Sequence, residues 1–137
     1  MIVGVGNDLI SVLRVQNIIF KFKEKFAKKI FTKNELLQAK TLKISAENFL
    51  PLAKFYAKRF AAKEAFAKAL GLGIGRGINF KDIEIFNDKF GKPAIKILNH
   101  KENFIKNHFH CENFAIHLSL SDEENLASAF VVIEKIS

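Results

Sequence analysis

Glu64 and Lys68 stand four residues apart in an alanine-rich stretch, residues 59–71. Alanine is the strongest helix former, so the stretch is predicted to be helical, and four residues make about one helical turn. The carboxylate and the ammonium group therefore share one side of the helix. The simplest interpretation is an ion pair on a solvated face, which stabilises a helix by about 0.2–0.5 kcal/mol and needs no function. The other hypothesis is a ligand site, because the small Ala61 beside the pair would not crowd a ligand.

Asp8 is a second acidic candidate. It lies near the end of an apolar, glycine-containing segment, residues 2–9, which is predicted to form a short buried strand. An aspartate at such a place is commonly a turn residue or a helix cap. Ser11 is able to cap the helix that follows, which leaves Asp8 available for another role.

The segment after the alanine-rich helix, residues 71–79, is rich in glycine. Backbone N–H groups in such a loop are able to line a phosphate, although a flexible connector has the same composition. The loop is not a dinucleotide fingerprint, because it follows a helix and has arginine at position 76, where the third glycine is needed. It also lacks the Gly-Lys-Ser/Thr of a Walker loop.

Two further patterns near the C-terminus each lack residues that the corresponding site requires. His108-x-His110-Cys111 resembles half of a zinc site, but structural zinc needs four ligands and the sequence shows no second pair. In the predicted strand over residues 114–121, one histidine and two serines share a face, but there is no Gly-x-Ser-x-Gly elbow of a serine hydrolase.

Residues 60–71, Phe-Ala-Ala-Lys-Glu-Ala-Phe-Ala-Lys-Ala-Leu-Gly, resemble the signature helix of the 4′-phosphopantetheinyl transferases. The sequence is most similar to the short bacterial type, the holo-acyl-carrier-protein synthases. The Gly-x-Asp of residues 6–8, with Arg14 six residues after the aspartate, resembles the family's opening motif. The block 82–93, which contains Asp-Ile-Glu and ends in Gly-Lys-Pro, also matches. The resemblance covers residues 6–134, nearly the whole chain.

This resemblance implies a reaction and the residues that perform it. The family transfers 4′-phosphopantetheine from coenzyme A to a serine of apo acyl carrier protein and releases adenosine 3′,5′-bisphosphate. It implies that Asp8 and Glu64 bind Mg²⁺, an ion that commonly takes one or two carboxylates together with substrate phosphates. It also implies that Lys68 stabilises the diphosphate and the leaving group, while Glu64 or a water on the ion takes the serine proton. The residues that it places near coenzyme A are Lys68, Gly73, Lys92, Pro93, Ser119 and Ser121.

The resemblance also implies partners. The acidic carrier protein is expected to meet the basic helix predicted over residues 12–31, through Arg14 and Lys21. A homotrimer with sites between subunits and a role in fatty acid biosynthesis are expected on the same ground. Some positions depart from the family pattern, and Asp122 is the most consequential, because a histidine that contacts the coenzyme is usual there. An aspartate would repel phosphate unless a lysine or a metal paired with it.

The elements that position these residues are predicted from periodicity and caps. A capping box, Thr32 to Glu35, starts a helix over 33–42, and a long helix follows over 48–70 with Pro51 in its first turn. Alternation predicts a hairpin over 81–98, and the chain ends in two strands. The order is strand, three helices, hairpin, short helix and two strands over a single domain, residues 1–137. This order predicts an α+β fold, with helices packed on a small antiparallel sheet.

Composition limits the remaining classes. The chain has 137 residues, 49% of them hydrophobic, and a formal net charge of +8, which favours an anionic partner. One cysteine excludes an internal disulfide framework, and the absence of a signal sequence or membrane span predicts a cytoplasmic protein without a membrane partner. The resemblance implies that the anionic partner is not a nucleic acid. The main alternative is a non-enzymatic basic domain that binds RNA or another anion. A different magnesium-dependent nucleotide transferase is a second alternative.

Overall fold

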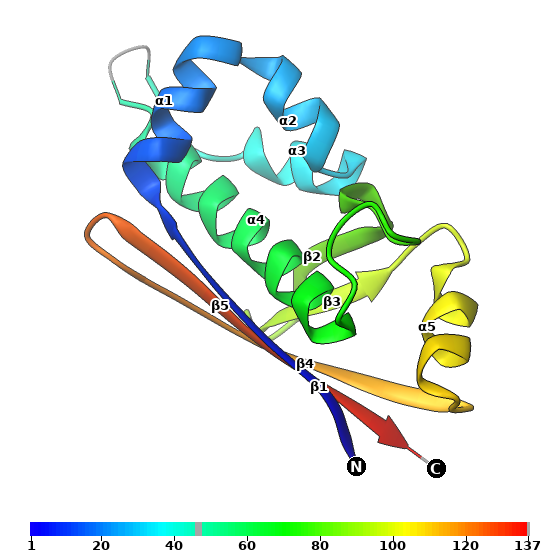
Figure 1. Cartoon of the computed structure of the whole chain (residues 1–137). Coiled ribbons are helices and arrows are strands. Elements are labelled where there is room, and N and C mark those ends of the chain that lie inside the picture. The colour runs from blue at the N-terminus through cyan, green and yellow to red at the C-terminus, as the bar shows by residue number, and fades with distance from the viewer. Residues whose placement is uncertain (46–47, 137) are drawn as a thin grey trace.

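The computed structural model describes residues 1–45 and 48–136 and confirms the predicted α+β class (Figure 1). Strand β1 (Ile2–Ser11) runs directly into helix α1 (Val12–Phe22). The remaining elements follow in the predicted order: α2 (Glu24–Ile30), α3 (Lys33–Ala39), α4 (Leu50–Leu70), a 3₁₀ turn (Phe80–Asp82), β2 (Ile83–Asn87), β3 (Pro93–Ile97), α5 (Lys101–Phe109), β4 (Asn113–Glu123) and β5 (Leu126–Ile136).

The strands form two antiparallel sheets, where the sequence predicted one. One sheet has the order β1-β5-β4, so the two ends of the chain pair with each other, and the other is the β2–β3 hairpin. In the first sheet Asp8 is opposite Ala129, and Ala129 is buried beneath α4. Because side chains alternate along a strand, Asp8 belongs to the face that α4 covers.

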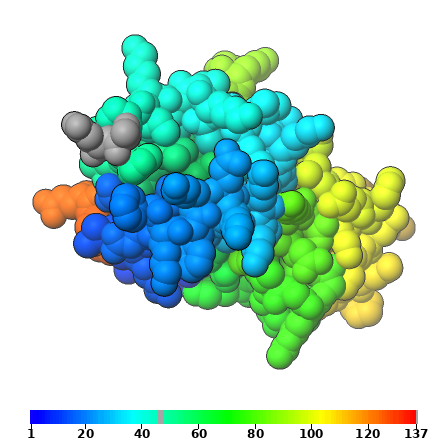
Figure 2. Space-filling view, turned by 90° about the horizontal axis from the view of Figure 1, so that it is seen from above, coloured from blue at the N-terminus to red at the C-terminus, as the bar shows by residue number. Residues whose placement is uncertain are grey.

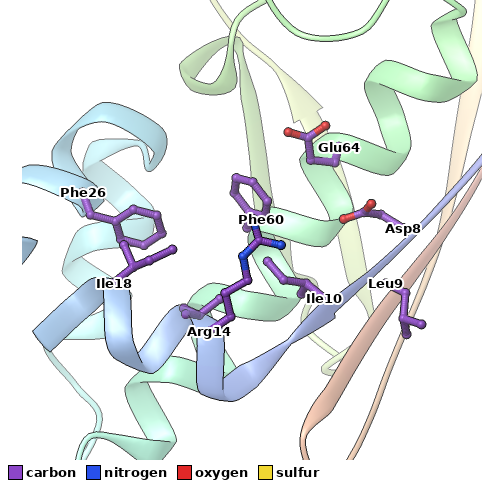
Figure 3. A pocket seen from close by; sticks show the side chains of 9 residues that line it. Asp8, Leu9, Ile10, Arg14, Ile18, Phe26, Phe60 and Glu64 are labelled. Carbon is purple, nitrogen blue, oxygen red and sulfur yellow. The ribbon is translucent and has the colours of Figure 1, made fainter. Parts of the chain in front are cut away.

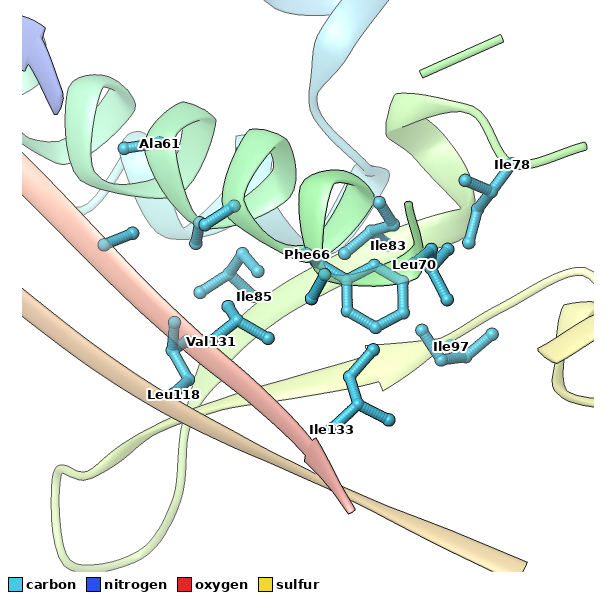
Figure 4. Close-up of a cluster of buried hydrophobic side chains, with 14 of the residues drawn as sticks. Ala61, Phe66, Leu70, Ile78, Ile83, Ile85, Ile97, Leu118, Val131 and Ile133 are labelled. Carbon is cyan, nitrogen blue, oxygen red and sulfur yellow. The ribbon is translucent and has the colours of Figure 1, made fainter. Parts of the chain in front are cut away.

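Helix α4 lies between the three-stranded sheet and the other helices, and it is buried on nearly every side (Figure 1). Phe66 and Leu70 of α4 pack with Ile83, Val131 and Ile133 in the main core (Figure 4). Although α4 is long, no helix among the described residues has the apolar run that crossing a membrane requires.

A buried ion pair connects α4 to its neighbours. Lys63 of α4 is fully buried, and its Nζ lies 2.6 Å from Oε1 of the equally buried Glu35. Glu84, within the segment where alternation predicted a half-buried strand, is also buried, and it accepts a hydrogen bond from the hydroxyl of Thr32. The capping box of Thr32 and Glu35 is present as predicted.

Two predicted elements differ in the structure. The helix predicted over 12–31 is broken at Lys23, whose φ is +50°, and the break lets Ala27 and Ile30 face the core while Phe22 is left exposed. The first strand is longer than predicted and only partly buried, because β1 is an edge strand and α4 covers one of its faces.

Gly6 allows β1 and α4 to approach closely. A Cβ atom at Gly6 would lie 2.0 Å from the carbonyl oxygen of Ala65, which is far inside a van der Waals contact. We expect Gly6→Ala to lower the free energy of unfolding by about 3 kcal/mol or more, because the helix would have to move away from the strand. Denaturant unfolding measures this change.

The matched control is Gly91→Ala. Gly91 has a φ of +82° but no atom within 4 Å of an added Cβ, so only backbone strain of about 1–2 kcal/mol is expected. An equal loss of unfolding free energy in Gly6→Ala and Gly91→Ala would show that the close approach of β1 to α4 is not the reason for glycine at position 6.

Candidate active site

Asp8 and Glu64 meet at one cavity. Asp8 comes from the inner face of β1, and Glu64 comes from the part of α4 that crosses it. Both line a cavity of about 180 Å³, together with Arg14 from the first turn of α1 (Figure 3). Phe60 forms part of the wall and packs on Phe80, with ring centroids 5.6 Å apart. The structure therefore brings the carboxylate of Glu64 to Asp8 and Arg14, which are near each other in the sequence but far from Glu64.

Lys68 pairs with Asp8 and not with Glu64. Its Nζ lies 3.1 Å from Oδ1 of Asp8 and also donates a hydrogen bond to the carbonyl oxygen of Asn7. The Glu64–Lys68 ion pair that spacing alone suggested is therefore not the arrangement found. Lys68 is half exposed whereas Asp8 is largely covered, so the ammonium group lies at the open edge of the carboxylate site.

The carboxyl of Glu64 has a pKa raised above its ordinary value. Burial is the main cause, the negative charge of Asp8 adds to it, and the positive charge of Lys68 opposes it. A carboxyl whose ionisation is disfavoured by burial and by a neighbouring carboxylate is a common feature of cation and acid–base sites.

This donor set fits Mg²⁺. The ion prefers oxygen ligands and usually completes its shell with water and substrate phosphates, so two carboxylates suffice on the protein side. A site built entirely from protein ligands is not indicated: within residues 1–45 and 48–136, no three His, Cys, Asp or Glu side chains cluster closely enough to hold a metal.

Gly73, Lys92 and Pro93 are not among the residues that line the carboxylate cavity. The N–H of Gly73 donates to the carbonyl oxygen of Ala67, so a phosphate at this amide would compete with that hydrogen bond. Lys92 and Pro93 lie at the turn between β2 and β3, where Asp88 accepts the N–H of Lys92. No hydrogen bond or ion pair found among the described residues joins these positions to Asp8, Glu64 or Lys68.

Ser119 and Ser121 lie on the opposite face of the sheet. Their neighbour Leu118 is buried toward α4, so the alternation of β4 directs both serines away from the helix, and both are exposed. His117 shares this face and lies 3.0 Å from Glu134. Within one chain the serine strand therefore does not reach the carboxylate cavity.

Asp122 is paired with a lysine, which offsets the negative charge that would otherwise repel a phosphate. Oδ1 of Asp122 lies 3.8 Å from Nζ of Lys58 on α4. Sequence patterns do not reveal this pair, or the pair of Lys63 and Glu35, because each joins residues that are far apart along the chain. An unusual charge at a family position, Asp122, was the signal that could have prompted a search for a compensating lysine.

The basic surface is formed by α1 and α2, which lie exposed on one side of the molecule, coloured blue (Figure 2). Arg14 and Lys21 lie on α1, and Lys21 is exposed, with its Nζ 5.3 Å from the ring centroid of Phe22. Arg14 therefore belongs both to this surface and to the carboxylate cavity.

Comparison with known proteins gives consistent matches over the full length. Residues 4–131 match the model of the 4′-phosphopantetheinyl transferase superfamily. The chain is 44% identical to a holo-[acyl-carrier-protein] synthase of Bartonella bacilliformis, over 99% of this chain and 98% of that protein. The structure is similar to the holo-[acyl-carrier-protein] synthase of Neisseria meningitidis, with a TM-score of 0.85, 38% identity, and coverage of 98% of this chain and 100% of that one.

A holo-(acyl-carrier-protein) synthase of Bacillus anthracis, solved in complex with CoA (3′,5′-ADP), is also similar. Its TM-score is 0.78, its identity 39%, and the match covers 99% of each chain.

The raised pKa of Glu64 predicts a stability difference that depends on pH. A carboxyl whose folded-state pKa is raised favours folding while it is protonated, and this contribution is lost as the pH rises through the folded-state pKa. Without divalent cations, the wild type should therefore lose stability relative to Glu64→Gln as the pH rises through that pKa. In an Asp8→Asn background the loss should be smaller, because the neighbouring charge is gone. Unfolding curves across pH 4–8 measure it, and equal pH dependence in both backgrounds would contradict the coupling.

Proposed function

The chain belongs to the 4′-phosphopantetheinyl transferase superfamily, and we propose that it is a magnesium-dependent holo-[acyl-carrier-protein] synthase. It transfers 4′-phosphopantetheine from coenzyme A to a serine hydroxyl of apo acyl carrier protein and releases adenosine 3′,5′-bisphosphate. The observation that carries this proposal is the convergence of Asp8, Glu64 and Lys68 at a cavity that Arg14 also lines. A cytoplasmic role in fatty acid biosynthesis is part of the proposal.

The bond changes define what the site has to supply. The serine oxygen forms a bond to the phosphorus that bears pantetheine, the bond from that phosphorus to the bridging oxygen breaks, and its electron pair leaves with the adenosine bisphosphate. Such transfers depend mainly on positioning and on neutralising charge. Asp8 and Glu64 would hold a magnesium ion, which would supply much of that neutralisation when bound.

The chain's own residues supply the rest. Glu64, or a water on the ion that Asp8 and Glu64 would hold, takes the proton from the serine hydroxyl. Lys68, at the open edge of the site, stabilises the charge that develops on the leaving group. Arg14 and Lys21 bind the acidic carrier at the rim, which mainly speeds association and is weakened by salt.

The non-enzymatic alternative is not favoured. The relatives described above match nearly the whole of this chain, and they are holo-acyl-carrier-protein synthases. The physical argument is also against it, because a surface selected only to bind an anion has no use for two carboxylates facing its cavity.

We also propose that the working unit is a homotrimer. The sheet face that α4 does not cover carries Val5, Leu9 and Phe130, each about half exposed or more, beside Ser119 and Ser121. Exposed apolar side chains on one face indicate an interface. Contacts of Ser119, Ser121, Gly73, Lys92 and Pro93 with coenzyme A would then come from a site completed by a neighbouring subunit.

Activity is tested by the intact mass of apo acyl carrier protein after incubation with coenzyme A, with and without Mg²⁺. We expect one phosphopantetheine to be added only with Mg²⁺, and Asp8→Ala and Glu64→Gln to lower the rate by about 10²–10⁴-fold. Glu112→Gln, an exposed glutamate away from the site, is the matched control. Near-normal rates in either site variant would contradict the residue assignment. No transfer to a carrier that another synthase modifies would contradict the function.

The oligomer is tested by light scattering. We expect the mass of three chains for the wild type, and smaller species with reduced transfer for Phe130→Lys, because a charge would be placed on the exposed apolar face. A monomeric wild type with full activity would contradict the trimer.

A further inference from the structure

Asn125, in the turn between β4 and β5, caps the N-terminus of α1. Its carbonyl oxygen accepts the N–H of Val12 at 2.7 Å, and its side-chain Oδ1 accepts the N–H of Leu13 at 2.7 Å. The N–H of Arg14 is accepted by Oγ of Ser11 at 3.2 Å. The first N–H groups of a helix have no partner within the helix, so Asn125 and Ser11 together satisfy the opening turn of α1.

The same asparagine also holds the cap itself. Nδ2 of Asn125 donates to Oγ of Ser11 at 3.1 Å, so the side chain connects the last residue of β1 with the first turn of α1. Ser11 and Asn125 are 114 residues apart in sequence. The contact is therefore tertiary, and it requires the β4–β5 hairpin to be in place.

This contact lies at the joint between β1, which carries Asp8, and α1, which carries Arg14 and Lys21. β1 passes into α1 without a loop, with Asp8 three residues before Ser11 and Arg14 three residues after it. A change in the angle at this joint would move Arg14 and Lys21 relative to Asp8. It would leave Asp8, Glu64 and Lys68 in place, because these are fixed by the pairing of β1 with β5 and by α4.

We propose that Asn125 is a positioning residue for carrier recognition, which holds α1 at the angle that presents Arg14 and Lys21 to the carrier protein. The inference rests on the proposed function. It assigns to the β4–β5 turn an effect mainly on one of the two substrates, since Asp8, Glu64 and Lys68 are held by β1 and α4 and not by α1.

A merely structural cap would behave differently. Loss of such a cap would lower stability and leave the two Michaelis constants unchanged, or change both alike through partial unfolding. A positioning role changes the KM for the carrier and leaves the KM for coenzyme A unaltered. Replacement of Asn125 by alanine keeps the main-chain bond to Val12 and removes the two side-chain bonds, so the fold should be retained.

The test compares Asn125→Ala with Asn113→Ala, an exposed asparagine at the other end of β4. Steady-state transfer is measured while apo carrier and coenzyme A are varied separately, at a temperature where both variants are folded by circular dichroism. For Asn125→Ala we expect the carrier KM to rise about 3–30-fold, as the loss of one or two hydrogen bonds predicts, with the coenzyme A KM within about twofold of wild type. Asn113→Ala should match the wild type in both.

Two further variants show whether the effect passes through α1. Asn125→Asp keeps an oxygen for the N–H of Leu13 and should restore most of the carrier affinity. In an Arg14→Ala background, Asn125→Ala should have a smaller effect on the carrier KM than it has alone. An unchanged carrier KM, or an equal rise in both KM values, with an active wild type would overturn this inference and leave the function standing. An inactive wild type would overturn the proposed function and this inference with it.

Discussion

The ion pair between Lys63 and Glu35 is the interaction on which the arrangement of this protein depends. Both side chains are fully buried. The Nζ of Lys63 also donates to the carbonyl oxygens of Ile30 and Phe80, and Oε2 of Glu35 accepts the N–H of Ile85. Burial lowers the pKa of Lys63, and the charge of Glu35 opposes that shift. A buried charge that loses its partner costs about 3–5 kcal/mol, so these segments are held to one arrangement.

This pair sets the rotation of α4 and therefore the site. Successive residues of a helix are about 100° apart, so fixing Lys63 inward among α2, α3 and β2 directs Glu64 to the cavity. The glycines of β1 then allow the strand to come close enough for Asp8 to reach the same cavity. The buried Lys63–Glu35 pair and the close approach at Gly6 thus determine where the carboxylates of Asp8 and Glu64 meet.

Local patterns were sufficient to predict most elements. The capping box at Thr32, the proline at the start of α4 and the stop at Gly71 all appear as local chemistry predicts, because each depends on neighbours within a few residues. The resemblance supplied the pairing of Asp8 with Glu64, which periodicity could not, since these residues lie on different elements. The burial of Lys63 and Glu84 could not be predicted from local pattern for a related reason. A polar side chain is predicted at the surface unless its partner is known, and the partners Glu35 and Thr32 lie elsewhere in the chain.

The burial of α4 has a consequence for how the protein is made. A helix that is buried on nearly every side gains most of its stability from its neighbours, and here these include β1 and β5. β1 pairs with β5, so the strand that carries Asp8 has no partner in its sheet until β5 has been synthesised. Domains fold as units during synthesis, and a nascent chain that has not yet reached β5 therefore lacks the carboxylate site. The nascent protein would begin to bind its substrates only once β1 and β5 have paired.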